Sequence, residues 1–167
     1  MFNYDDISII LGTRMCGKTS IARKLAQNLS IDYYYFDYNI MDLNYLRDFY
    51  DLNKTKRTVI IFDNYFKMNK NKLVDALFRK NTNFAIIYVM NYIDKFMLKL
   101  SDSIYIAKEL NYEANKHYYN NLKQYFTNCS IAWIVNSMED LKDYGFLCFD
   151  KELRHKKKEE YMKIKCI

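Results

Sequence analysis

An eight-residue motif near the amino terminus constrains the fold more than any other feature of the sequence. Residues 12–19 are GTRMCGKT and match the pattern G-x-x-x-x-G-K-[ST]. The chain has only three glycines and no proline, and two of the glycines stand in this motif. A short apolar run over 7–11 precedes the motif, and apolar residues at helical spacing follow it between 21 and 29. The pattern therefore predicts a strand, a tight loop and a helix.

This strand–loop–helix unit predicts a loop that binds phosphate. Glycine has no Cβ, so the backbone can approach an anion closely, and successive N–H groups form a nest at the start of a helix. In such a loop Lys18 reaches the β- and γ-phosphates of a nucleotide, and the Thr19 hydroxyl is a ligand of Mg2+. The residues expected to hold the nucleotide are Gly12, Thr13, Arg14, Met15, Cys16, Gly17, Lys18, Thr19 and Ser20.

A carboxylate at the end of a buried strand is the second part of such a magnesium site. The run TVIIFD over 58–63 ends in Asp63, which we expect to hold the metal together with Thr19. Asp37 also ends a β-rich run and is the alternative. Asn64 follows Asp63 where ATPases of the additional-strand division usually have a glutamate. An amide can orient a water molecule but cannot accept its proton.

Strand and helix patterns alternate along the rest of the chain. Strands are expected over 7–11, 32–36, 58–62, 84–90 and 103–107, and two late strands over 131–135 and 145–149 are expected to pair antiparallel with each other. Helices are expected over 18–28, 40–49, 70–79 and 112–126. The runs over 58–62 and 84–90 are continuously apolar, as in strands of a parallel sheet covered on both faces. We predict one α/β domain over residues 1–150 with a mostly parallel sheet, followed by a basic tail over 151–167.

Composition limits the partners and the compartment. The net charge is +6, and residues 151–165 carry seven Lys/Arg against three Glu, so +4 of it lies in the tail. That charge permits a polyanionic partner, although the mixed signs of the tail favour a solvated helix or frayed end. The four cysteines are far apart and do not have the spacing of a zinc site. With no signal-peptide pattern and no membrane-length apolar run, we expect an intracellular protein with no membrane partner.

The order of the segments resembles the FtsK–HerA group of ATPases. The segments are GTRMCGKTS, VIIFDN, LFRKNTNFAIIYVMN and SDSIYIAKE, and within that group they are most similar to the DNA-packaging ATPases of poxviruses and other large DNA viruses. The resemblance implies a three-layer P-loop NTPase sandwich of the additional-strand type, with ATP and Mg2+ as ligands. It also implies double-stranded DNA as the partner, a homo-oligomeric ring, contacts with capsid or portal proteins, and a place in the host cytoplasm or the virion.

Residue roles follow from this resemblance position by position. Lys18 and Thr19 correspond to the Walker A pair and Asp63 to the magnesium aspartate. Arg79 corresponds to an arginine finger that acts on the nucleotide of a neighbouring subunit, and Asn91 to a sensor that is glutamine in the family. The chain departs from the family at Asn64 and Asn91.

Two alternatives stay open at the level of sequence. A small P-loop kinase, which phosphorylates a nucleotide or another small molecule, would use Asp37 to bind the acceptor; against it, residues 100–128 contain no arginine for a phosphate lid. A nucleotide-binding subunit that hydrolyses poorly and serves assembly would explain Asn64. The three tyrosines over 33–35 are interpreted as half-buried sheet residues.

Overall fold

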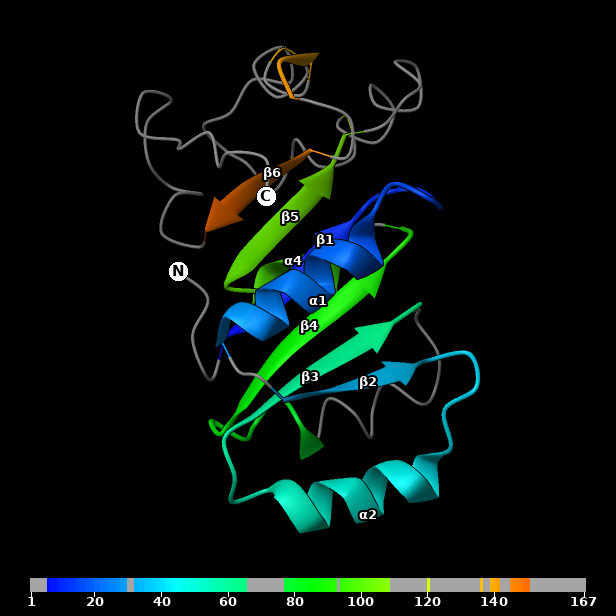
Figure 1. Ribbon diagram of the computed structural model, residues 1–167, viewed down its shortest axis with the longest axis vertical. Coiled ribbons are helices and arrows are strands. Elements are labelled where there is room, and N and C mark those ends of the chain that lie inside the picture. Colours follow the sequence, from blue (N-terminus) through cyan, green and yellow to red (C-terminus); the bar gives the residue numbers. More distant parts are fainter. Residues whose placement is uncertain are drawn as a thin grey trace.

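The computed structural model describes residues 6–29, 32–65, 77–92, 94–108, 120, 136, 139–141 and 145–150. Its centre is a six-stranded sheet with the order β2-β3-β4-β1-β5-β6 (Figure 1). Every neighbouring pair is parallel except β5 and β6, which are antiparallel. The strands are β1 Ile7–Leu11, β2 Tyr33–Asp37, β3 Thr58–Asp63, β4 Phe84–Met90, β5 Ser103–Ala107 and β6 Phe146–Asp150.

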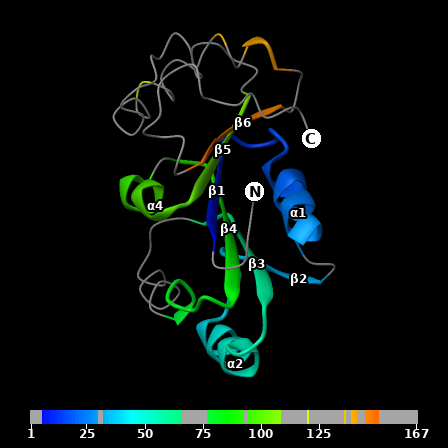
Figure 2. The ribbon, with the colours of Figure 1, turned by 90° about the vertical axis from the view of Figure 1, so that its left-hand side faces the viewer.

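Helices cover both faces of this sheet and make a three-layer sandwich. Helix α1 (Lys18–Leu29) lies on one face, and α2 (Leu43–Asn53) and α4 (Lys95–Leu100) lie on the other (Figures 1 and 2). The central strands β3 and β4 are buried along their whole length because both of their faces are covered. This explains why their sequences are continuously apolar rather than alternating.

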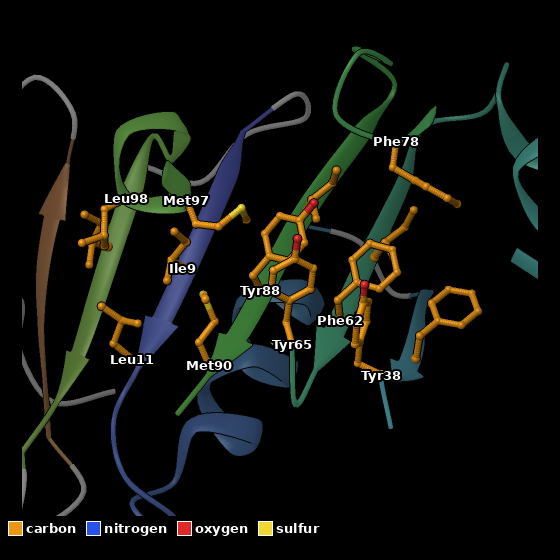
Figure 3. Close-up of a cluster of buried hydrophobic side chains, with 14 of the residues drawn as sticks. Ile9, Leu11, Tyr38, Phe62, Tyr65, Phe78, Tyr88, Met90, Met97 and Leu98 are labelled. Carbon is orange, nitrogen blue, oxygen red and sulfur yellow. The ribbon is translucent and has the colours of Figure 1, made fainter. Parts of the chain in front are cut away.

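The larger core lies between the sheet and the α2–α4 layer and is rich in aromatic rings (Figure 3). Phe62 is fully buried there and stacks on Tyr88 with ring centroids 5.6 Å apart. It also makes an edge contact with Phe78 at 5.6 Å. Such ring pairs add to the stabilisation that burial of apolar surface provides. This core fixes β3, and hence the position of the carboxylate at its end.

Strand β4 lies between β1 and β3 and is hydrogen-bonded to both. The strand before the glycine loop and the strand that ends in Asp63 are therefore separated by one strand. An extra strand at this position fits the additional-strand type that the resemblance implies. The structure confirms the predicted α/β class, the mostly parallel sheet and the three layers.

Several element boundaries differ from those expected. The second helix was predicted to start at Ile40 but begins at Leu43, because the Asp42 side chain accepts a hydrogen bond from the Asn44 N–H and caps it. Helix α4 was not predicted; it has only six residues, too few to show a period, and Asp94 caps it. Strand β6 confirms a late antiparallel strand after Gly145, but its partner is β5. The partner expected over 131–135 lies outside the described residues.

Some predictions fall outside the described residues. These are most of the helices expected over 70–79 and 112–126, the strand expected over 131–135, and the basic tail over 151–167. Within the described part of the chain, no helix is both long and apolar enough to cross a membrane.

Candidate nucleotide-binding site

The glycine motif forms a loop between β1 and α1, at the carboxyl edge of the sheet (Figure 1). Met15 and Gly17 have φ angles of 66° and 87°, in the left-handed region. Glycine adopts this region without steric cost, whereas Met15 is held there by the loop. Gly17 then accepts the first helical bond, from the Ile21 N–H at 3.1 Å. The loop thus leads directly into the amino terminus of α1, where the helix dipole stabilises an anion.

The Lys18 ammonium lies inside this loop. Its side chain is buried, and Nζ donates to the Thr13 carbonyl oxygen and lies 3.7 Å from the Cys16 sulfur. The Cys16 thiol itself donates to the Thr13 carbonyl at 3.1 Å. These partners are neutral, and a buried positive charge is stabilised best by an anion. The loop therefore fits a phosphate group.

A cavity of about 530 Å³ opens beside the loop. This volume is in the range of sites for small molecules and cofactors. Its lining combines the loop, the first turns of α1 and one residue of β6: Met15, Gly17, Lys18, Thr19, Ser20, Ile21, Lys24 and Phe146. Thr13 and Arg14, which were also predicted to bind, are exposed in the same loop. The cavity is large enough for a nucleotide whose phosphates lie against Lys18.

Thr19 and Asp63, the two predicted magnesium ligands, are in direct contact. The Thr19 hydroxyl donates to Asp63 Oδ2 at 2.8 Å, although 44 residues separate them in the chain. Asp63 is buried at the end of β3. Hydroxyl and carboxylate oxygens are the ligands that Mg2+ prefers, so this pair fits the ion. Asp37, the sequence alternative, does not make this contact with Thr19; its Oδ1 accepts from the Asn39 N–H at 3.0 Å and from Asn64.

Asn64 links Asp63 to the neighbouring strand. Its φ of 55° is left-handed, a conformation that asparagine tolerates better than most residues. Its backbone N–H donates to Asp63 Oδ1 at 2.7 Å, and its side-chain Nδ2 donates to Asp37 Oδ1 at 3.2 Å. The carbonyl oxygen of the Asn64 carboxamide is therefore directed away from Asp37.

Tyr35 also belongs to this site, although no sequence motif indicates it. Its hydroxyl donates to Asp63 Oδ2 at 2.6 Å, and the Arg23 guanidinium lies 5.1 Å from the centre of its ring. Burial, then the hydrogen bond and negative charge of Asp63, then the charge of Asp37, raise the pKa of Tyr35 well above its usual value. The hydroxyl therefore stays protonated and remains a donor at neutral pH. The interpretation of Tyr35 as a plain sheet residue was incomplete.

The remaining predicted residues, Asn91 and Arg79, lie toward opposite edges of the sheet. Asn91 directly follows β4 and is exposed at the carboxyl edge, next to the end of β1, because Met90 pairs with Leu11. Arg79 precedes β4, so its backbone lies toward the opposite edge, where Asn83 accepts a hydrogen bond from the Thr58 N–H at the start of β3. Its guanidinium lies 5.2 Å from the centre of the Phe96 ring. The structure thus groups Lys18, Thr19, Asp63 and Asn64 but places Arg79 apart from them.

Comparison with known proteins finds similarity at the level of structure. Neither a protein-family model nor a curated protein sequence matches the chain. The genome packaging NTPase B204 of Sulfolobus turreted icosahedral virus 2, solved with AMPPCP, superposes with a TM-score of 0.63 and 15% identity over 91% of this chain and 95% of that one. Its complex with sulfate gives 0.61 at 16% identity, over 91% and 94% of the two chains.

A more distant similarity is to PCH-2 of C. elegans, with a TM-score of 0.51 and 16% identity over 75% of this chain and 42% of PCH-2. At identities this low, the superpositions support a common fold and nothing beyond it. Together with the loop, the inserted strand β4 and the Thr19–Asp63 contact, they lead to one structural conclusion: the chain has the fold of a P-loop NTPase.

Proposed function

We propose that this protein is a Mg2+-dependent ATPase that couples hydrolysis to the movement of double-stranded DNA, in the packaging of a viral genome. The observation that carries the proposal is the contact of Thr19 with Asp63 beside the buried Lys18 ammonium. The similarity to a packaging NTPase over nearly the whole of both chains supports the choice of a motor over other nucleotide-binding proteins.

Each residue of the site has a distinct task in this proposal. Lys18 and the loop N–H groups bind the β- and γ-phosphates, and Thr19 and Asp63 hold Mg2+. The ion, when bound, neutralises charge on the phosphate oxygens. Asn64 orients the attacking water through its carbonyl oxygen. Asn91, next to the loop at the end of β4, senses the γ-phosphate.

Arg79 acts on a neighbouring subunit in this proposal. Its backbone leads to the amino end of β4, away from the loop of its own chain. In this proposal an arginine placed there acts on the nucleotide of another copy, as a finger supplied in trans does. The active form is therefore a homo-oligomeric ring, with double-stranded DNA, capsid or portal proteins as partners.

The small-molecule kinase is the weaker alternative. Strand β4 between β1 and β3 is the arrangement of the ATPase division. In addition, Asp37, the acid that a kinase would use for its acceptor, is hydrogen-bonded to Asn64 and Asn39. Both observations favour the ATPase.

The test is phosphate release from ATP with Mg2+, measured alone, with double-stranded DNA, and with small-molecule acceptors. We expect release to be stimulated by DNA and abolished in Lys18→Ala. Lys54→Ala, which removes a solvent-exposed ion pair with Asp51, is the control and keeps full activity. Formation of ADP that depends on a small-molecule acceptor, without any response to DNA, would contradict the motor.

A further inference from the structure

Strand β2 places Tyr35 on the same side of the sheet as the candidate magnesium aspartate. The β2–β3 register pairs Asp37 with Asp63 and Tyr35 with Ile61. Side chains alternate along a strand, so Tyr35, Asp37 and Asp63 leave the sheet on the face covered by α1. Tyr35 is thus a diagonal neighbour of Asp63, at a separation that an aromatic side chain can span.

Among the residues that the structure describes, three donors converge on the Asp63 carboxylate. Oδ2 accepts from the Thr19 hydroxyl at 2.8 Å and from the Tyr35 hydroxyl at 2.6 Å, and Oδ1 accepts from the Asn64 N–H at 2.7 Å. Hydrogen bonds to an ionised acceptor are short and stronger than neutral ones. Thr19 belongs to the phosphate loop and Asn64 adjoins Asp63 in sequence. Tyr35 comes from neither segment and anchors the carboxylate from the edge of the sheet.

Packing into either hydrophobic core does not explain the position of Tyr35. Its side chain is 37% exposed, on a strand at the edge of the sheet. The adjacent Tyr34 differs, because its ring packs on Phe49 of α2 at 4.6 Å on the other face. The ring of Tyr35 instead lies against the Arg23 guanidinium of α1, and its hydroxyl is directed at Asp63.

We propose that Tyr35 is a positioning residue for Mg2+: its hydroxyl holds the Asp63 carboxylate in the orientation from which Asp63 and Thr19 bind the ion. This proposal rests on the binding of nucleotide with Mg2+ in the proposed function, and it is independent of DNA movement. It assigns a role to a residue that lies in neither of the sequence motifs of the site.

The test compares Tyr35→Phe with Tyr34→Phe in the full chain. Both variants lose one hydroxyl from neighbouring positions of the same strand, but only Tyr35 contacts Asp63. The measurement is the affinity for a fluorescent ATP analogue, first with EDTA and then at increasing Mg2+ concentration. We expect Tyr35→Phe to bind as wild type in EDTA and to need about tenfold more Mg2+ for the same gain in affinity, since a hydrogen bond to a charged group is lost. Tyr34→Phe should follow the wild-type curve.

Three other results overturn the proposal. An unchanged Mg2+ requirement in Tyr35→Phe shows that Asp63 is oriented without the hydroxyl. An equal loss of affinity in EDTA shows a general structural role instead. If Mg2+ does not change the affinity of the wild-type protein for the analogue, the protein has no metal site of the proposed kind.

A protein that passes this test but does not hydrolyse ATP, or does not respond to DNA, contradicts the proposed function and leaves the role of Tyr35 standing.

Discussion

The side-chain amide of Asn64 is hydrogen-bonded to Asp37, which occupies the register position beside Asp63 on the neighbouring strand. A carboxylate can only accept in this contact, so it must face Nδ2 of the amide, and the carbonyl oxygen of Asn64 is directed elsewhere. The sequence raised the question of how the amide of Asn64, which cannot accept a proton, could orient a water molecule next to a magnesium aspartate. The structure shows that the amide is held in one orientation by an acid from β2.

Asp37 is therefore expected to matter through the hydrogen bond that it accepts. Asp37→Ala removes the acceptor, and we predict about a tenfold loss of kcat with little change in the KM for ATP. Asp37→Asn keeps an oxygen that can accept the bond and should retain most of the activity. Steady-state kinetics of the two variants, with Asp48→Asn on the exposed face of α2 as a control, check this. An Asp37→Asn variant as inactive as Asp37→Ala would show that the charge, and not the hydrogen bond, is required.

Lys18 is expected to contribute most of the phosphate affinity. Lys18→Ala removes the buried ammonium that lies within the loop, so ATP binding should weaken by at least about tenfold. Calorimetric titration with ATP measures this, and Lys54→Ala supplies a control lysine on the surface. An unchanged affinity in Lys18→Ala would mean that the nucleotide does not bind at this loop.

Arg79 is expected to act across a subunit interface. Arg79→Ala should lower turnover by about a thousandfold, as the loss of an arginine finger does, while ATP affinity stays close to wild type. Mixing Arg79→Ala with Lys18→Ala should restore part of the activity, because some interfaces then combine an intact loop with an intact arginine. Lys80→Ala, at the adjacent exposed position, is the matched control.

A mixture with no more activity than its two components would argue against action in trans. Arg79 also lies over the Phe96 ring, so thermal unfolding of Arg79→Ala must be compared with wild type. A large loss of stability in that variant would assign Arg79 a structural role.

Phe62 is expected to stabilise the fold more than any surface residue. It is fully buried and contacts Tyr88, Phe36 and Phe78. Phe62→Ala should lower the free energy of unfolding by about 3–5 kcal/mol through lost apolar contact and a residual cavity. Urea denaturation measures the change. Leu52→Ala, at a position 73% exposed, should stay within about 0.5 kcal/mol of wild type.

Local features of this chain were predictable from sequence because they depend on neighbouring residues alone. The phosphate loop needs two glycines, a lysine and a threonine at fixed spacing, and its strand and helix follow from apolar periodicity. Strands β3 and β4 were recognised because strands buried on both faces are continuously apolar. The boundaries of α2 and the short α4 were not predicted correctly, because single capping residues determine them.

The contacts that complete the site depend on the order and register of strands, which no local pattern encodes. Residue types and their spacing were enough to predict the α/β class, the loop and the pairing of Lys18 and Thr19 with an acid at the end of a buried strand. The assembled sheet was needed to show that β4 separates β1 from β3, that Asp63 rather than Asp37 contacts Thr19, and that Tyr35 and Asp37 lie beside Asp63 and Asn64. Parallel strands bring residues far apart in the chain to one edge of the sheet, and that adjacency exists only once the strands have assembled.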